Sequence, residues 1–283
     1  MGTSLLACGA SLEEYQKFSA AGQEYAVALD SLLVTSGNYF VDANSEILLR
    51  DDLGEPTLDT QTYNQITTND KQWLELIARM RVHTDLLKRY FLALENLATS
   101  NAPEQAQQVT ERIFTQLNSV GTKIQGTSLI SNEAGTALSQ IPEIILSQKI
   151  EGALREELQE RKEAIYRELI LQDLVLKLLT NQIEKNLQII QDNKDARTTL
   201  PLYTAPEPIS DPDAWIEQRR NIRTMTISVE ALKNAAQASD EFKKSFQLLL
   251  EDKFTLARAN ALLADIESLI KVAEDIKKAT NSS

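Results

Sequence analysis

The side chains that most often carry catalysis or bind metals are scarce in this sequence, which holds one histidine, His83, and one cysteine, Cys8. A single cysteine excludes an internal disulfide framework and a structural zinc site built on cysteines. No Glu-x-x-His motif exists, so a di-iron helical bundle is excluded. His83 occupies a heptad position among apolar residues, which predicts that it packs against another helix rather than acting as a ligand or a base.

Motifs for phosphate binding and for nucleophilic catalysis do not occur in the sequence. It has no Gly-rich phosphate loop, no Gly-x-Ser-x-Gly turn and no cysteine–histidine pair. Three acidic pairs lack the spacing of a calcium loop and are expected to be solvated helix faces or caps. These pairs are Asp51–Asp52, Glu156–Glu157 and Asp240–Glu241. We therefore assign no catalytic, cofactor-binding or metal-binding residue, expect no cofactor, and interpret the protein as not being an enzyme.

The one tight basic cluster consists of Arg219, Arg220 and Arg223. It could meet an anionic partner, but we expect these arginines to pair with acidic residues of a neighbouring helix. Trp73 and Trp215 lie near the expected starts of two helices, and both are interpreted as core or end-of-bundle anchors.

The first ten residues are uncharged and contain the sequence Leu5-Leu6-Ala7-Cys8. Two aliphatic residues, a small residue and a cysteine resemble the lipobox of bacterial lipoproteins. The resemblance implies that Cys8 is acylated and that it anchors the chain to the extracytoplasmic side of the cell envelope. Only Met1 to Ser4 precede this sequence, so the charged region and most of the apolar region of an export signal are missing there. The alternative is a cytoplasmic or secreted soluble protein in which Cys8 is an ordinary leader residue.

Composition and charge narrow the class of protein. Hydrophobic residues make up 42% of the 283 residues, which is enough for a core, and the chain has only nine glycines and seven prolines. So few breakers argue against sandwiches and barrels, which need a turn about every ten residues. The net charge of −12 argues against a general nucleic-acid binder. No run of about 18 apolar residues exists, so no transmembrane helix is expected.

The spacing of apolar residues predicts the helices that must position any binding surface. Heptad patterns predict helices over 12–50 and 70–99, and Pro103 suits the first turn of a third helix over 103–125. Pro142 is expected to open a fourth helix that ends at about 193. Residues 51–69 are rich in Asp, Thr and Asn, and are expected to form a loop.

Glycines and prolines mark the expected breaks. Gly22 and Gly37 each lower the stability of the first helix by about 1 kcal/mol relative to alanine, and a break near Gly37 is one outcome. Residues 194–210 contain three prolines and are interpreted as a hinge. Asp211 is expected to cap a fifth helix that begins at Pro212. That helix could continue to about 279, because no glycine or proline interrupts it; a turn near Ser239-Asp240 is the alternative.

These observations predict an all-α protein of long antiparallel helices, forming a bundle with an extended coiled-coil portion. We expect a leader at 1–10 and a single extended helical domain over 11–283, with the Pro-rich hinge at about 194–210. The expected function is a non-enzymatic scaffold or protein-interaction module that presents a helical surface to a protein partner. Self-association is an option, nucleic acid is not expected, and the membrane is reached only through a lipid anchor at Cys8. The alternative function is a helical-bundle toxin or pore-forming subunit, which would need an apolar hairpin that the sequence does not show.

Overall fold

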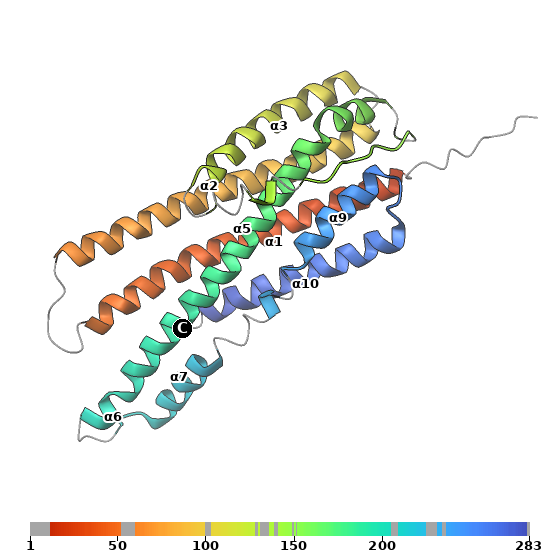
Figure 1. Cartoon of the computed structure of the whole chain (residues 1–283). Helices are drawn as coiled ribbons and strands as arrows, with labels where there is room; N and C mark the ends of the chain where they lie inside the picture. The colour runs from red at the N-terminus through yellow and green to blue at the C-terminus, as the bar shows by residue number, and fades with distance from the viewer. Residues whose placement is uncertain are drawn as a thin grey trace, which may run out of the picture. The chain divides into compact units, whose positions relative to one another are not determined.

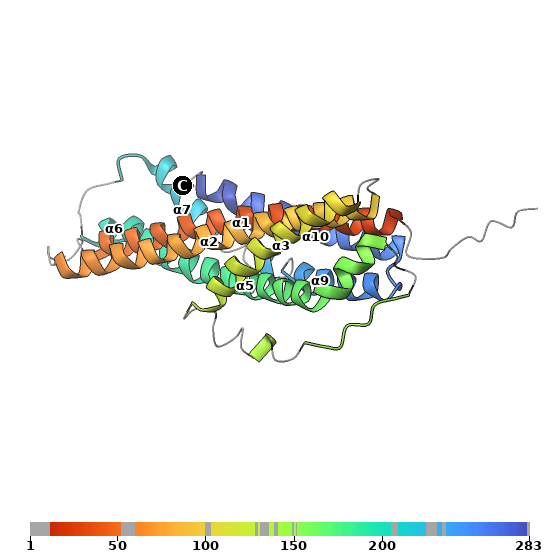
Figure 2. The same cartoon turned by 90° about the horizontal axis from the view of Figure 1, so that it is seen from above.

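A computed structural model describes residues 12–51, 60–99, 103–127, 130, 136–138, 141–148, 150, 152–204, 209–224, 231–233 and 236–281. No strand occurs in these ranges, and long helices pack as a bundle, which confirms the predicted all-α fold. The helices with their bounds are α1 (Leu12–Asp51), α2 (Thr60–Thr99), α3 (Pro103–Gln125), α5 (Gly152–Thr199), α6 (Pro201–Thr204), α7 (Pro212–Thr224), α9 (Ala238–Leu250) and α10 (Leu256–Asn281). Helices α1 and α2 lie side by side and run in opposite directions in both views (Figures 1 and 2).

Contacts divide the chain into two compact units, each built from segments that are distant in sequence. The first unit comprises Met1–Asp30, Arg79–Lys177 and Ala235–Lys271. The second unit comprises Ser31–Ala78, Leu178–Asn234 and Val272–Ser283. Helices α1, α2, α5 and α10 each contribute residues to both units, so neither unit is a continuous stretch of the chain.

The core of the first unit centres on a cluster of phenylalanines. The ring of Phe18 stacks on that of Phe242, with 5.0 Å between centroids, and meets the ring of Phe91 edge to face at 5.6 Å. Gly22 makes this packing fit, because a Cβ atom there would lie 2.7 Å from the Phe91 ring and 3.0 Å from that of Phe242. The residue that lowers the helix propensity of α1 therefore allows the aromatic side chains to approach its backbone.

The core of the second unit joins α1, α2 and α10. The Tyr39 hydroxyl donates a hydrogen bond to the carbonyl of Ile276 at 3.0 Å, and the ring of Phe40 stacks on that of Trp73 at 5.2 Å. Trp73 is buried, as expected for a core anchor. Heptad positions predicted from the sequence are buried in both units, among them Tyr25, Leu32, Tyr39, Met80, Leu87, Leu94, Leu169, Leu176, Ile183 and Ile190.

The predicted helix over 12–50 is confirmed by α1, without the break near Gly37, whereas the expectation for the start of α2 is wrong. Helix α1 continues through Gly37, which lies against Leu74 and Ile77 of α2, so close packing stabilises a position that looked like a break. Helix α2 begins at Thr60, although 51–69 was expected to be a loop. The polar residues of its first turns are mostly exposed, which a helix in water tolerates. The hydroxyls of Thr67 and Thr68 donate to the carbonyls four residues earlier, at 2.9 and 2.7 Å.

The expected start of a helix at Pro142 is also wrong. Residues 141–147 are irregular, and the Ser147 amide donates to the carbonyl of Leu250 at 2.8 Å. Helix α5 starts at Gly152, whose φ of 64° lies in the left-handed region that favours glycine. Because a right-handed helix cannot pass through such a residue, the backbone turns there. At its other end α5 continues to Thr199 rather than ending at about 193.

The expectation of one continuous helix over 212–279 is wrong as well, since α7, α9 and α10 are separate. The alternative turn near Ser239-Asp240 is close to the observed one, because residues 236–237 form a turn and α9 begins at Ala238.

A second turn, between α9 and α10, was not expected. Asp252 adopts a φ of 60°, and its amide donates to the carbonyl of Leu249 at 3.2 Å. The amide of Lys253 donates to the carbonyl of Leu248 at 2.8 Å. These two bonds form the motif that commonly closes a helix through a left-handed residue. Aspartate stands where glycine is usual, so no glycine or proline in the sequence marks the end of α9.

None of the described helices combines the length and the apolar character needed to cross a lipid bilayer.

Candidate functional site

Helix α5 carries three carboxylates into the interior of the first unit. Glu157, Glu168 and Asp173 are 0%, 2% and 4% exposed. Removing a carboxylate from water is costly unless donors replace the water, so each of these groups requires partners. The partners come from α2, from α9 and from α5 itself.

His83 of α2 is fully buried and lies between two side chains of α5. Its Nε2 donates to Glu168 Oε2 at 2.7 Å, and the Gln172 amide nitrogen donates to its Nδ1. The Thr84 hydroxyl donates to Gln172 Oε1 at 3.4 Å, which orients the amide nitrogen of Gln172 toward the ring. Gly121 of α3 leaves space for this cluster, because a Cβ atom there would lie 2.5 Å from Glu168 Oε2. His83 thus contacts another helix, as its heptad position predicted.

Glu157 lies about three turns before Glu168 along α5. Its partners are a side chain of α2 and a side chain one turn further along α5. It accepts hydrogen bonds from the Tyr90 hydroxyl at 2.7 Å and from the Arg161 guanidinium. Burial raises the pKa of Glu157, and burial together with the nearby carboxylate raises the pKa of Tyr90. The expectation that the pair Glu156–Glu157 is a solvated face is therefore wrong for Glu157, although Glu156 is exposed.

Asp173 joins α5 to α9. It accepts hydrogen bonds from Lys243 at 2.7 Å, from Lys177 at 2.8 Å and from the Ser239 hydroxyl. Burial alone would raise the pKa of Asp173, but these three donors outweigh it and hold the pKa below its usual value. Lys243 also pairs with Asp240 at 2.8 Å, so that acidic residue contributes to an ion-pair network rather than only to a solvated face.

The arrangement of these buried groups can fix the helices in one register but offers little to a substrate. A general base must reach the proton that it removes, whereas both ring nitrogens of His83 are occupied by Glu168 and Gln172. Within the described part of the chain, no group of three or more His, Cys, Asp or Glu residues is placed to hold a metal ion. Buried polar contacts of this kind specify which helix faces meet, because any other alignment leaves them unpaired.

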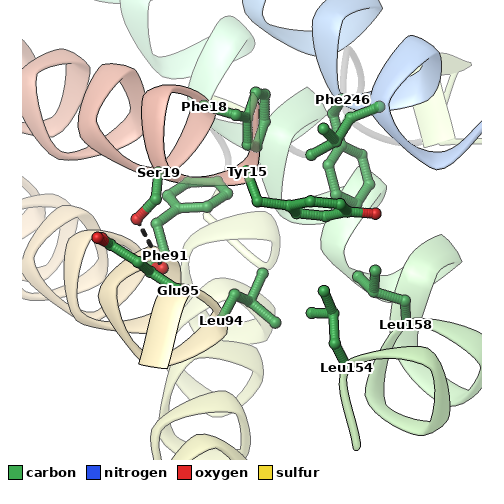
Figure 3. Close-up of a pocket in the computed structure, with 10 residues that line it drawn as sticks. Tyr15, Phe18, Ser19, Phe91, Leu94, Glu95, Leu154, Leu158 and Phe246 are labelled. Atoms are coloured by element: carbon green, nitrogen blue, oxygen red, sulfur yellow. Dashed lines mark hydrogen bonds between the residues drawn. The ribbon is translucent and has the colours of Figure 1, made fainter. Parts of the chain in front are cut away.

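A small hollow lies beside this network, lined almost entirely by apolar side chains (Figure 3). Leu94, Leu154 and Leu158 lie around the ring of Tyr15, whose hydroxyl is buried without a hydrogen-bond partner among the described residues. Burial raises the pKa of Tyr15. The Ser19 hydroxyl donates a hydrogen bond to the backbone carbonyl of Phe91 in α2, at 2.9 Å. The space is about 10 Å³, roughly that needed by one water molecule. It does not have the size of a small-molecule site.

The second unit presents a different kind of surface, built on α7. Asp211 caps this helix as predicted, accepting a hydrogen bond from the Ala214 amide at 3.0 Å. The Trp215 indole donates to the carbonyl of Thr198 at 3.1 Å, which ties the start of α7 to the end of α5. This is the anchoring role that the sequence predicted for Trp215. Ile222 is 2% exposed and completes the attachment.

The three arginines of α7 have different surroundings. Arg223 pairs with Asp195 of α5 at 2.9 Å, as expected for the basic cluster. The guanidinium of Arg219 lies over the Trp215 ring, 5.6 Å from its centroid. Arg220 is exposed and has no ion-pair partner among the described residues. The expected pairing with a neighbouring helix is thus seen for one of the three arginines.

Apolar side chains are exposed along α6 and the first half of α7. Of the 14 exposed large hydrophobic residues in the described ranges, five fall within residues 200–216. These five residues, which we call the α6–α7 surface, are Leu200 (39% exposed), Leu202 (45%), Tyr203 (85%), Ile209 (36%) and Ile216 (47%). Their exposure was not predicted from the sequence; the signal available was three large apolar residues, Leu202, Tyr203 and Ile209, in the Pro-rich stretch 194–210 that was interpreted as a hinge.

The predicted lipidation site, Cys8, lies outside the described residues, and so does Asp52 of the first acidic pair. Acylation of Cys8 and anchoring in the cell envelope therefore stay predictions from the sequence.

No protein-family model matches the chain, and neither the curated proteins nor the solved structures contain a significant match to it. Any function must therefore be argued from its own residues.

Proposed function

We propose that this chain is a non-enzymatic helical module that binds a protein partner, and that the partner docks on the α6–α7 surface. The observation that carries the proposal is the exposure of Leu202, Tyr203 and Ile216, at 45%, 85% and 47%. These residues are close in the sequence, and groups of exposed apolar side chains are typical of interaction sites, because leaving them in water is unfavourable.

The residues beside this surface have the composition of a binding site. Tyrosine, tryptophan and arginine contribute most of the energy in many protein interfaces, and Tyr203, Trp215 and Arg220 supply one of each. Helix α7 is held to α5 by Trp215 and by the ion pair of Arg223 with Asp195. A surface held in place before binding loses less conformational entropy when a partner docks.

A protein partner fits this surface better than a membrane does. Helix α7 exposes the carboxylates of Asp213 and Glu217 as well as the guanidinium of Arg220, and the whole chain has a net charge of −12. Anionic headgroups would repel these carboxylates. A protein surface can instead place its own basic groups opposite them.

The proposal is tested by placing a photo-crosslinking amino acid at position 203 of the full chain, in the cells that naturally make it. We expect a protein adduct at position 203 that disappears when Ile216→Asp is added, because a carboxylate there makes the surface polar. The matched control carries the crosslinker at position 75, an exposed site on α2 of the same unit. The proposal fails if position 203 gives no adduct, gives adducts only with lipid, or gives the same adducts as position 75.

A further inference from the structure

Helix α7 distributes its exposed charges unevenly along its length. Asp213 and Glu217 lie in its first half, while Arg220 lies in its second half, together with Arg219 and Arg223. At 100° per residue, Asp213, Glu217 and Arg220 fall on the side of the helix opposite the buried Ile222. The outward face of α7 is therefore acidic at one end and basic at the other.

Such a face is complementary to itself when two copies meet in opposite directions. In a two-fold symmetric contact, residue i of one copy meets residue j of the other, and j meets i. Antiparallel pairing places the acidic half of each helix against the basic half of its partner. Parallel pairing would place like charges together, so the charge pattern specifies one direction.

Ile216 supplies an apolar side chain at the edge of this face. It is 47% exposed and lies between Asp213 and Arg220 in sequence, near the middle of α7. In the antiparallel register that brings Glu217 opposite Arg220, Ile216 lies opposite Asn221 of the other copy, and burying it there would remove apolar surface from water. Leu202 and Tyr203 of α6 are also exposed apolar residues of the second unit.

We propose that a second copy of this chain is the partner that occupies the α6–α7 surface, through antiparallel pairing of α7 with α7. This inference rests on the proposed function, since it names the partner for the same surface. Helix α7 has 13 residues, which at 1.5 Å per residue is about 20 Å of helix. A stable protein interface buries on the order of 1,200 Å² in total, which a helix of this length does not supply by itself. The dimer is therefore reversible and depends on protein concentration.

Sedimentation velocity of the full chain over a concentration series tests the pairing. The native chain shifts from monomer to dimer as its concentration rises. Glu217→Arg and Arg220→Glu each place like charges opposite one another, and each weakens the dimer at least tenfold. An equimolar mixture of the two variants restores it, because each chain carrying Glu217→Arg then meets opposite charges on a chain carrying Arg220→Glu. Glu75→Arg makes the same change in net charge as Glu217→Arg at an exposed site of α2, and it leaves the dimer unchanged.

Other results overturn the pairing. It is wrong if the native chain stays monomeric at every concentration, or if the mixed variants do not recover the dimer. The crosslinking experiment separates this failure from that of the proposed function. An adduct between position 203 and a different protein overturns the second copy as partner but leaves the docking surface. The absence of any protein adduct at position 203 overturns both.

Discussion

Replacing Asp173 by asparagine tests whether the buried ion pairs of α5 hold the first unit together. The pair of Asp173 with Lys243 spans 2.7 Å, and their side chains are 5% and 15% exposed. Breaking a buried ion pair costs about 3–5 kcal/mol. Asparagine keeps an acceptor for Ser239, and Lys243 keeps its contact with Asp240, so we expect a smaller loss, about 2–3 kcal/mol of unfolding free energy. The half-exposed Lys177 adds little to this value.

The loss should depend on pH in a direction that the structure fixes. Burial raises the pKa of Asp173, but its donors outweigh burial and lower it below the usual value. A carboxyl group whose folded pKa is depressed stabilises the protein above its unfolded pKa, about 4, and loses this effect as pH falls through the folded pKa. The difference between the native chain and Asp173→Asn is therefore constant from about pH 7 to pH 5. It decreases only below about pH 4.

Urea unfolding followed by far-ultraviolet circular dichroism measures this difference, because it reports the helices of both units. Tryptophan fluorescence is unsuitable, since Trp73 and Trp215 both lie in the second unit. Asp30→Asn is the matched control: its ion pair with Arg81, at 2.7 Å, lies in the first unit but is exposed, so we expect a loss below about 1 kcal/mol. The reasoning is refuted if Asp173→Asn costs no more than this control, or if its effect already falls between pH 7 and 5.

Two further substitutions test the packing and the turn. Gly22→Ala should destabilise the protein by about 1–3 kcal/mol, because the added Cβ would collide with Phe91, although alanine has the better helix propensity. Thermal unfolding measures the loss, and a gain in stability would contradict the prediction. Asp252→Val should cost about 1–2 kcal/mol, since a β-branched residue fits a φ of 60° poorly. Asp252→Gly should cost much less, and equal losses in the two variants would show that the left-handed conformation is unimportant.

Heptad spacing predicted the long helices because burial repeats every three or four residues along each of them. The bounds of α3 and the cap at Asp211 were also predicted, since Pro103 and Pro212 have a fixed φ that suits a first helical turn. The turn at Asp252 could not be predicted in the same way. Its left-handed conformation depends on how the following segment packs, and aspartate is not a residue type that requires it.

The buried carboxylates were harder to predict than the apolar core. Periodicity placed His83 against another helix but could not name Glu168 as its partner, because the two residues belong to different helices. A usable signal did exist in α5. The stretch around Asp173 is apolar on nearly all sides, and a helix that is hydrophobic all round is buried. Any acidic residue within it must then find donors inside the protein, as Asp173 does.

The molecule departs from the usual distribution of polar and apolar residues in two ways, and the two have different consequences. In the first unit, Glu157, Glu168 and Asp173 are buried, and each is matched by donors of the same unit. Because these hydrogen bonds form only when the helices are aligned as observed, they can fix that alignment. In the second unit, Tyr203 and Ile216 are exposed, and nothing within the described residues covers them. A partner that docked there would remove that apolar surface from water, so the proposed function depends on the α6–α7 surface rather than on the buried acids.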